Sequence, residues 1–554
     1  MKKYFFITII SLLLPYFVVF GQISTMEEPM SFRTDIPALA RSNVPVLYLP
    51  SLDMERIMQE DIEDEKLGMP PRFGYKFRVS YNLENSGEWL TLPDGGRIWR
   101  LSLSSPGALS INLLYDKFWL PDGAKLWIYS SDRRHSIGAF TSFNNIGGKY
   151  DVRGFATGLV FGDQITIEYY VPNNQKEVGI ISIAYVVHGY RHIRSPDSFD
   201  SFRFDDLESC QVNINCIEGQ NWQNEKNAVA MILVGGYREC TGALINNTAN
   251  DKRPLFLTAF HCLSERIDAV INPNLDHWSF WWHYESPYCE DAVPVIRSTV
   301  GAAAVAYCPT TDFALLLLTE DPRDAPGVTP YYLGWDITPN PGRGGVSIHH
   351  PLGNIKKIAT HDIYPRNSVC MDVTIDGIFM CNSKFWMINW MATPNGHSIP
   401  APGSSGAPLL NNYGRVIGQL QGPGSCPSIN CHNPSRALSN FGKLRYSWLG
   451  ITGGRLGEWL DPLDKGVSTW GSCGMCTFSN RLVIIDETIT GCYSLEVENV
   501  IIIFGATLTL IAPGNIYISN ITIAENSRLI LYAGGDIIID GYLDVHLGGE
   551  FEIK

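Results

Sequence analysis

The sequence predicts an all-β protein built from several β-rich segments. Glycine (51 residues) and proline (33 residues) are abundant, and 12% of the residues are aromatic, a composition that suits a turn-rich β protein. Long amphipathic helices are not evident, which excludes a helical bundle or coiled coil. With 45% apolar and 18% charged residues the chain can bury large cores, and 554 residues correspond to three to four domains.

The first 21 residues have the pattern of a secretory signal peptide. Two lysines precede an apolar run, Tyr4–Phe20, and the small residue Gly21 follows it. The alternative is a signal anchor that stays in the membrane, but Pro15 disfavours a straight membrane helix. We therefore expect removal of residues 1–21 and a protein that is secreted or held at the cell surface.

All thirteen cysteines lie between Cys210 and Cys492. In an exported chain they are expected to form disulfides, with at least one cysteine left over. This abrupt change in cysteine content predicts a boundary near residue 209. The preceding polar segment, Arg194–Glu208, has no hydrophobic period and is expected to be an exposed linker that proteases can cut.

Residues 75–188 are predicted to form a β-sandwich. Short alternating runs such as Lys125–Tyr129 and Gln164–Tyr170 recur there, separated by turn sequences such as Pro93-Asp94-Gly95. Residues 22 to about 70, which include the charge-rich stretch Met54–Lys66, show no pattern and are expected to be a lead-in.

The composition changes again after Ser468. The stretch Leu508–Ile518 resembles Leu529–Ile539, which begins 21 residues later, and Leu543–Ile553 is a weaker third copy. Such repeats predict short stacked strands in a small solenoid or sandwich, with an ordinary β-meander as the alternative. A segment of this kind, residues 467–554, is expected either to attach the protein to a surface or to secretion machinery, or to be a passive stabilising tail.

Three motifs occur in the order His, Asp, Ser. His261 follows a strand-like run, Asp312 precedes one, and Ser405 lies in Pro402-Gly-Ser-Ser-Gly-Ala-Pro408. Each motif alone is weak, but together they fit a double β-barrel serine peptidase. A serine hydroxyl needs a base to remove its proton, which would be His261, and Asp312 would fix the histidine tautomer. The backbone N–H groups of Gly403 and Ser405 would then stabilise an oxyanion.

Residues 210–466 resemble the bacterial lysyl endopeptidases, which belong to the trypsin-like clan. The resemblance rests on Cys240-Thr-Gly-Ala, the three motifs above, Gly334-Trp-Asp, Ile348-His-His-Pro and Glu458-Trp-Leu-Asp-Pro. It implies a trypsin-like double β-barrel over residues 210–466. Residues 22–209 are similar to the pro-regions of such peptidases, which here would assist folding or cover the cleft.

The resemblance also implies three disulfides, which are Cys210–Cys426, Cys216–Cys289 and Cys240–Cys262. A clip between Cys370 and Cys381 is a separate hypothesis. The spacing Cys473-x-x-Cys476 is compatible with zinc or redox chemistry, but a structural disulfide is the favoured interpretation.

The sequence departs from this family in the specificity pocket. Lysine specificity needs a carboxylate to pair with the substrate ammonium, but the corresponding position is Ser439, followed by Asn440, and Gln421 replaces a cleft histidine. The expected maturation segment, residues 177–209, also contains no lysine. A pocket lined by these residues is expected to take a neutral side chain, with an acid elsewhere in the chain as the alternative.

The sequence therefore predicts a secreted serine endopeptidase that acts on polypeptides and needs no metal or organic cofactor. Its net charge is −14 without a basic stretch, so nucleic acid is not an expected partner. One alternative is a non-catalytic surface binder that keeps a peptidase fold. Another is an adhesin whose main functional part is the C-terminal repeats.

Overall fold

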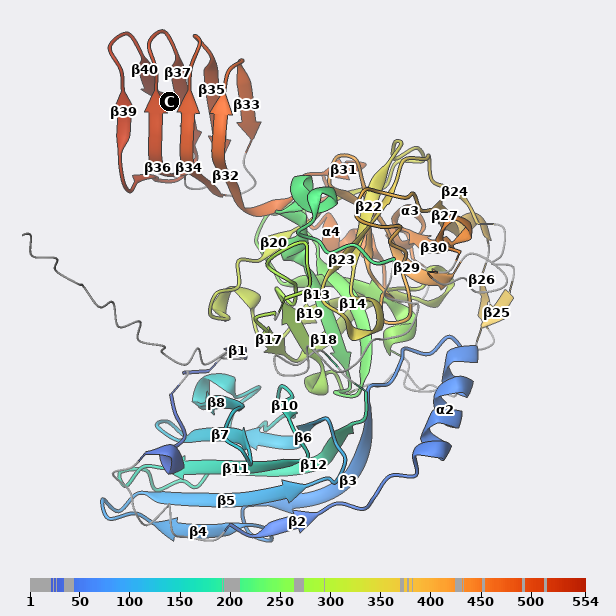
Figure 1. Ribbon diagram of the computed structural model, residues 1–554, viewed down its shortest axis with the longest axis vertical. Helices are drawn as coiled ribbons and strands as arrows, with labels where there is room; N and C mark the ends of the chain where they lie inside the picture. The colour runs from blue at the N-terminus through green and yellow to red at the C-terminus, as the bar shows by residue number, and fades with distance from the viewer. Residues whose placement is uncertain are drawn as a thin grey trace, which may run out of the picture.

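The computed structural model contains three β-rich parts that follow one another along the chain (Figure 1). It describes residues 21–554 except 23, 26, 34–43, 192, 194–209, 264–273, 293, 369–372, 376–377, 381, 424–430, 432, 451–453, 491–493 and 513–515. The predicted signal peptide, apart from Gly21, and the predicted linker lie outside these residues. Within the described part of the chain, no helix is long and apolar enough to span a bilayer.

The N-terminal part contains two sheets packed as the predicted β-sandwich, with side chains from both sheets in one core. One sheet contains β3 (Gly74–Asn82), β6 (Ser110–Trp119), β9 (Phe155–Ala156), β10 (Val160–Phe161) and β12 (Ile180–Gly189). The other contains β2 (Val46–Tyr48), β4 (Glu88–Thr91), β5 (Arg97–Ser104), β7 (Lys125–Ser130), β8 (Ser136–Phe140) and β11 (Gln164–Val171).

The charge-rich stretch expected to be a patternless lead-in is instead a helix, α2 (Met54–Lys66). Asp53 caps it by accepting a hydrogen bond from the backbone N–H of Arg56, and Ile57 is fully buried. The cap and the charges in the first and last turns are helix signals. The expectation was wrong because the apolar face is narrow, so the helix depends on tertiary contacts that its hydrophobic pattern does not show.

The central part contains two large sheets, as expected for two barrel halves. The first runs in the order β1 (Gly21–Gln22), β17 (Arg297–Val300), β16 (Ser279–Trp282), β13 (Val229–Val234), β14 (Arg238–Leu244), β15 (Leu255–Ala259), β19 (Phe313–Leu318) and β18 (Ala302–Cys308). The second runs in the order β23 (Lys357–His361), β22 (Gly345–His349), β28 (Pro408–Asn411), β29 (Arg415–Pro423), β30 (Leu438–Lys443), β27 (Phe385–Asn389) and β24 (Arg366–Asn367).

Shorter elements complete this part. They are β21 (Gly334–Asp336), which pairs with β29 and β31 (Thr469–Trp470), the hairpin β25 (Val373–Ile375) and β26 (Ile378–Met380), α3 (Leu444–Trp448) and α4 (Leu456–Leu460). The strand β20 (Tyr331–Tyr332) pairs with the first strand of the C-terminal part and so joins the two parts.

The C-terminal part is a parallel β-solenoid. One sheet contains β32 (Cys473–Val483), β34 (Ser494–Ile502), β36 (Ile516–Ile523), β38 (Ile537–Ile539) and β39 (Leu543–Val545), and the other contains β33 (Glu487–Thr490), β35 (Thr507–Ala512), β37 (Arg528–Ala533) and β40 (Glu550–Ile553). Most coils pair in parallel at the 21-residue offset seen in the sequence, for example Leu508 with Leu529. A meander would pair antiparallel, so the solenoid prediction is confirmed.

Candidate active site

His261 and Asp312 meet because the strands beside them are neighbours. His261 lies in a short 3-10 helix, Phe260–Leu263, directly after β15, and Asp312 directly precedes β19, which pairs antiparallel with β15. The Nδ1 atom of His261 is 2.8 Å from Oδ2 of Asp312, and the backbone N–H of His261 donates to Oδ1 at 2.9 Å. The carboxylate is buried, which places it to hold the imidazole in one orientation.

The segment around Ser405 is fixed against the same barrel half by backbone contacts. The N–H of Thr241 in β14 donates to the carbonyl oxygen of Ser405 at 2.8 Å. A Cβ atom at Gly406 would lie 2.2 Å from Oγ1 of Thr258 and 2.7 Å from the backbone nitrogen of Ala259. Only glycine fits here, and φ at Gly406 is +85°. Because Ala259 is two residues before His261, these contacts bring the three sequence-predicted residues into one region.

The turn before Ser405 leaves two backbone N–H groups available. The carbonyl oxygen of Gly403 accepts from Oγ1 of Thr241 at 2.9 Å, and the turn is closed by the N–H groups of Ser404 and Ala407. Among the described residues, no acceptor takes the N–H of Gly403 or of Ser405. Two unpaired donors two residues apart, one of them the N–H of the half-buried Ser405 itself, are compatible with an oxyanion site.

The neighbouring serine has a different environment. Ser404 is fully buried, and its Oγ is 2.8 Å from Nδ1 of His349 and accepts from the N–H of Ala401 at 3.2 Å. Burial lowers the pKa of His349 to about 3, so this imidazole is neutral. His349 and His350 are both buried, and His349 also anchors the turn that carries Ser405.

The disulfides agree with two of the three pairings that the resemblance implied. Cys240–Cys262 joins β14 to the residue after His261, and Cys216–Cys289 is also present. Cys210, however, pairs with Cys431, so the expected Cys210–Cys426 bond is wrong. Sequence spacing cannot choose between two cysteines five residues apart, whereas a disulfide needs matched Cα positions, here 5.3 Å apart.

Two of the cysteines outside these three bonds are free. Cys308 and Cys473 are buried free thiols, so Cys473 does not form the bond proposed with Cys476. The hypothetical Cys370–Cys381 clip lies outside the described residues. The described residues contain no group of side chains that would hold a metal ion.

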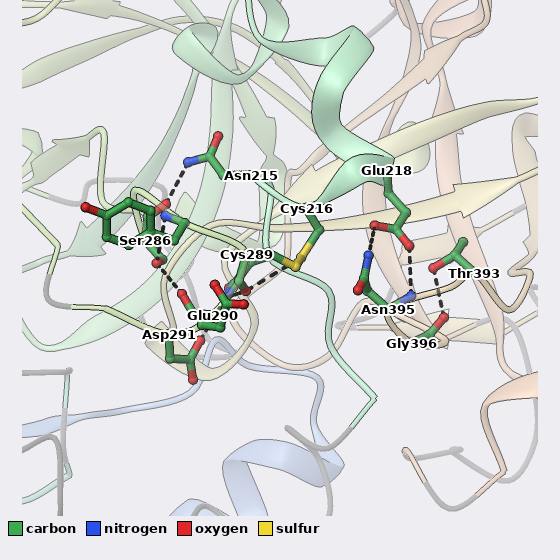
Figure 2. Close-up of a disulfide and its surroundings, with 12 residues drawn as sticks. Asn215, Cys216, Glu218, Ser286, Cys289, Glu290, Asp291, Thr393, Asn395 and Gly396 are labelled. Atoms are coloured by element: carbon green, nitrogen blue, oxygen red, sulfur yellow. Dashed lines mark hydrogen bonds between the residues drawn. A yellow bond between two sulfur atoms is a disulfide. The ribbon is translucent and has the colours of Figure 1, made fainter.

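The start of the central part is tied to its surroundings by two disulfides and one pair of hydrogen bonds. Figure 2 shows the Cys216–Cys289 bond and, beside it, Glu218, whose two carboxylate oxygens accept from the backbone N–H and the side-chain amide of Asn395 at 3.0 and 2.9 Å. Cys216–Cys289 thus ties this stretch to the segment after β16 of the first sheet, and the Glu218–Asn395 bonds and Cys210–Cys431 tie it to segments next to strands of the second sheet.

The predicted specificity residues lie together on two paired strands. Ser439 and Asn440 are in β30 and pair with Pro423 and Gly422 of β29, respectively. Gln421 precedes Gly422 and lies at a β-bulge in β29. Oγ of Ser439 accepts from Nε1 of Trp390 at 2.9 Å.

Among the described residues, the polar atoms of this group meet no charged partner. Oδ1 of Asn440 and Oε1 of Gln421 are buried without a hydrogen-bond partner. In the described part of the chain, none of the hydrogen bonds of Ser439, Asn440 or Gln421 involves a carboxylate.

Comparison with known proteins shows what the central part of the chain is similar to. Residues 204–437 match the family described as lysyl endopeptidase, C-terminal domain. A lysyl endopeptidase of Pseudomonas aeruginosa is 26% identical over 359 residues, which are 60% of this chain and 70% of that protein. Residues 204–437 are thus similar to the C-terminal domain of lysyl endopeptidases. This similarity supports a serine endopeptidase.

Solved structures of peptidases align with parts of the chain. A protease of M. tuberculosis in its active form gives a TM-score of 0.27 at 15% identity and covers 46% of this chain and 93% of its own. A Glu endopeptidase gives 0.23 at 14% identity, with 39% and 85% covered.

Sequence reasoning missed three residues that shape the site. Thr241 contacts both Gly403 and Ser405, His349 holds Ser404, and Trp390 fills the space beside Ser439. Thr241 could have been identified from the sequence, since it directly follows Cys240. No local sequence signal distinguishes His349 and Trp390 from core residues.

Proposed function

We propose that this protein is a secreted endopeptidase that hydrolyses polypeptides through a Ser405–His261–Asp312 triad. The observation that carries the proposal is the pair of hydrogen bonds from His261 to the buried carboxylate of Asp312, at 2.8 and 2.9 Å. A buried carboxylate that accepts from both the ring and the backbone of one histidine orients that ring, which is what a general base requires.

In this mechanism Oγ of Ser405 attacks the scissile carbonyl carbon, and its proton moves to Nε2 of His261. The carbonyl oxygen becomes an oxyanion that the N–H groups of Gly403 and Ser405 stabilise, each with about 3–4 kcal/mol in comparable sites. His261 then protonates the leaving amine, which leaves an acyl-enzyme on Ser405. Water, deprotonated by His261, releases the acid product and restores the serine.

The primary pocket takes a neutral side chain in this proposal. An ammonium ion there would meet the hydroxyl of Ser439 and the amides of Asn440 and Gln421, with no carboxylate bonded to them among the described residues to compensate for its desolvation. The unpaired oxygens of Asn440 and Gln421 favour side chains that donate hydrogen bonds. Lysine specificity, the property named for the Pseudomonas relative, is thus not proposed for this chain.

The proposed maturation follows the segments of the sequence. Residues 1–21 are a signal peptide, 22–209 a pro-region, 210–466 the peptidase and 467–554 a solenoid for attachment. Insertion of a new N-terminus beside the nucleophile, as in digestive enzymes, is disfavoured because Ser404 has a neutral histidine partner and Cys210 is tethered by its disulfide.

A digest of an unbiased peptide library tests the function. Purified protein, with its pro-region removed, is compared by mass spectrometry with the Ser405→Ala variant. We expect cuts that depend on Ser405 and follow neutral residues. Cuts after lysine would overturn the proposed pocket, and absence of any Ser405-dependent cut would overturn the enzymatic proposal in favour of a binding protein.

A further inference from the structure

A short segment of the N-terminal part adds to the edge of β14. The N–H of Phe73 donates to the carbonyl oxygen of Tyr237 at 3.0 Å, and the N–H of Glu239 donates to the carbonyl oxygen of Pro71 at 3.0 Å. Between these bonds, Arg72 lies opposite Arg238 in an antiparallel bridge. The segment Pro70–Phe73, called here the edge segment, therefore binds β14 as an added strand.

Two arginines fix the edge segment. The guanidinium group of Arg238 donates to the carbonyl oxygen of Pro70 at 2.6 Å and to Oδ2 of Asp64 in α2 at 2.6 Å. Arg72 pairs with Asp61 of the same helix at 2.7 Å. Arg238 is almost fully buried, so its charge-assisted bonds hold the edge segment strongly.

The edge segment and the nucleophile share one edge of β14. The N–H of Glu239 bonds to the edge segment and the N–H of Thr241 to Ser405, and residues two apart in a strand point to the same side. At about 3.3 Å per residue, the two acceptor oxygens lie roughly 7 Å apart along the edge. A substrate chain whose scissile bond lies at Ser405, and which continues along this edge, would place the second residue beyond that bond where the edge segment now lies.

This position is on the leaving-group side. The proposed primary pocket, formed by β29 and β30, belongs to the second sheet and holds the acyl side of the substrate. The edge segment lies on the first sheet, next to the Cys240–Cys262 bond. Among the described residues, the hydrogen bonds and ion pairs of the N-terminal part do not involve Ser439, Asn440 or Gln421.

We propose that the edge segment is a built-in inhibitor that occupies the binding site for the leaving-group side of a polypeptide and leaves the acyl pocket open. The proposal rests on the proposed function, because it needs Ser405 as the nucleophile. The precursor is then a selective enzyme: it accepts small acyl substrates and rejects polypeptides until the N-terminal part has been removed.

Two substrates with the same acyl group test this. One is a nitrophenyl ester, which has no residue beyond the scissile bond, and the other is a peptide that continues for four residues beyond it. The uncleaved full chain is expected to hydrolyse the ester at a rate close to that of the matured protein and the peptide at least tenfold more slowly. Maturation is achieved by cutting the folded full chain within 194–209 and separating the pieces.

A pair of variants in α2 isolates the edge segment without changing the mature sequence. Asp64→Ala removes the charge-assisted bond to Arg238 and the ion pair at 3.5 Å to Arg72 of the edge segment, which shifts an equilibrium by roughly tenfold or more. It should raise peptide cleavage by the precursor by about that factor and leave ester cleavage unchanged. Glu63→Ala, on the same helix but bonded only to Gln59 and Lys66, should change neither rate.

Each outcome has one meaning. A precursor that cleaves ester and peptide equally well overturns the proposal but leaves the triad intact. A precursor inactive on both substrates, with a matured form active on both, also overturns it, since the N-terminal part would then block the whole site. If the matured protein cleaves neither substrate, the proposed function itself fails and this inference falls with it.

Discussion

Replacement of Asp312 by asparagine removes one acceptor and keeps the shape of the side chain. Two donors face this carboxylate, which are the backbone N–H of His261 at 2.9 Å and its Nδ1 at 2.8 Å. Asparagine has one acceptor oxygen and one NH2 group. If the NH2 group faced the backbone N–H, two donors would meet in a buried site, at a penalty of about 1–3 kcal/mol.

The oxygen of the asparagine is therefore expected to face the backbone, and its NH2 group to face Nδ1. Nδ1 must then accept, which moves the ring proton to Nε2, so the histidine cannot take the proton of Ser405. A tautomer error of this kind lowers catalysis by about 10,000-fold in a serine protease triad, or about 5 kcal/mol of transition-state stabilisation. The fold should be unaffected, because φ of Asp312 is +55° and asparagine tolerates this left-handed conformation.

The assay is kcat/KM of Asp312→Asn and of the parent, on the same extended peptide after maturation, together with the melting temperature of both. We expect a loss of three to four orders of magnitude with an unchanged melting temperature. A variant that melts like the parent and keeps kcat/KM within tenfold of it would refute the assignment of Asp312. A lower melting temperature would point instead to a structural role.

Three further predictions concern stability, specificity and pH. Replacement of both Cys240 and Cys262 by alanine opens a loop with a sequence separation of 22 and should lower the free energy of unfolding by about 3 kcal/mol, measured by urea denaturation; an unchanged midpoint would contradict this. Ser439→Asp places a carboxylate in the neutral pocket, so cuts after lysine should appear in the library digest, and a digest pattern identical to the parent would show that Ser439 is not in the pocket. Burial raises the pKa of Glu239 to about 8 and that of Glu320, which also bonds to Asn144 of the N-terminal part, to about 7. Because the folded state binds these protons more tightly than the unfolded state does, their stabilising contribution is complete below about pH 4.5 and is lost as the pH rises through 7 to 8. The melting temperature of the uncleaved chain should accordingly fall between pH 5 and pH 8, and the double variant Glu239→Gln, Glu320→Gln should flatten that dependence.

Much of the fold was predictable because its signals are local. Alternation of apolar residues indicated the sandwich, and the 21-residue repeat indicated the solenoid, since each coil reproduces the same turn and the same inward-facing positions. The helix α2 was missed because it has few apolar residues and its contacts with distant parts of the chain are ion pairs, such as Asp61 with Arg191 and Asp64 with Arg238. Its strongest signal, the cap at Asp53, was present in the sequence but was outweighed by the high charge of the segment.

The candidate site was predictable to the extent that its residues occur in short motifs. His261, Asp312 and Ser405 were recognisable from their order and their flanking strands and turns, and their positions in the structure follow from the pairing of β15 with β19 and from the contact of Thr241 with Ser405. The hypothesis of a neutral pocket came from the residue types at Ser439 and Asn440, which a sequence displays directly.

The sequence by itself determined which chemical groups are available, where turns and strands alternate and which cysteines are available for disulfides. Only the tertiary structure decided that Cys210 pairs with Cys431, that His349 holds Ser404, and that Pro70–Phe73 adds to β14. The physical reason is the range of the interactions. Turn and strand preferences act over a few residues, whereas these contacts join segments from 55 to more than 200 residues apart, and their formation depends on how whole sheets pack.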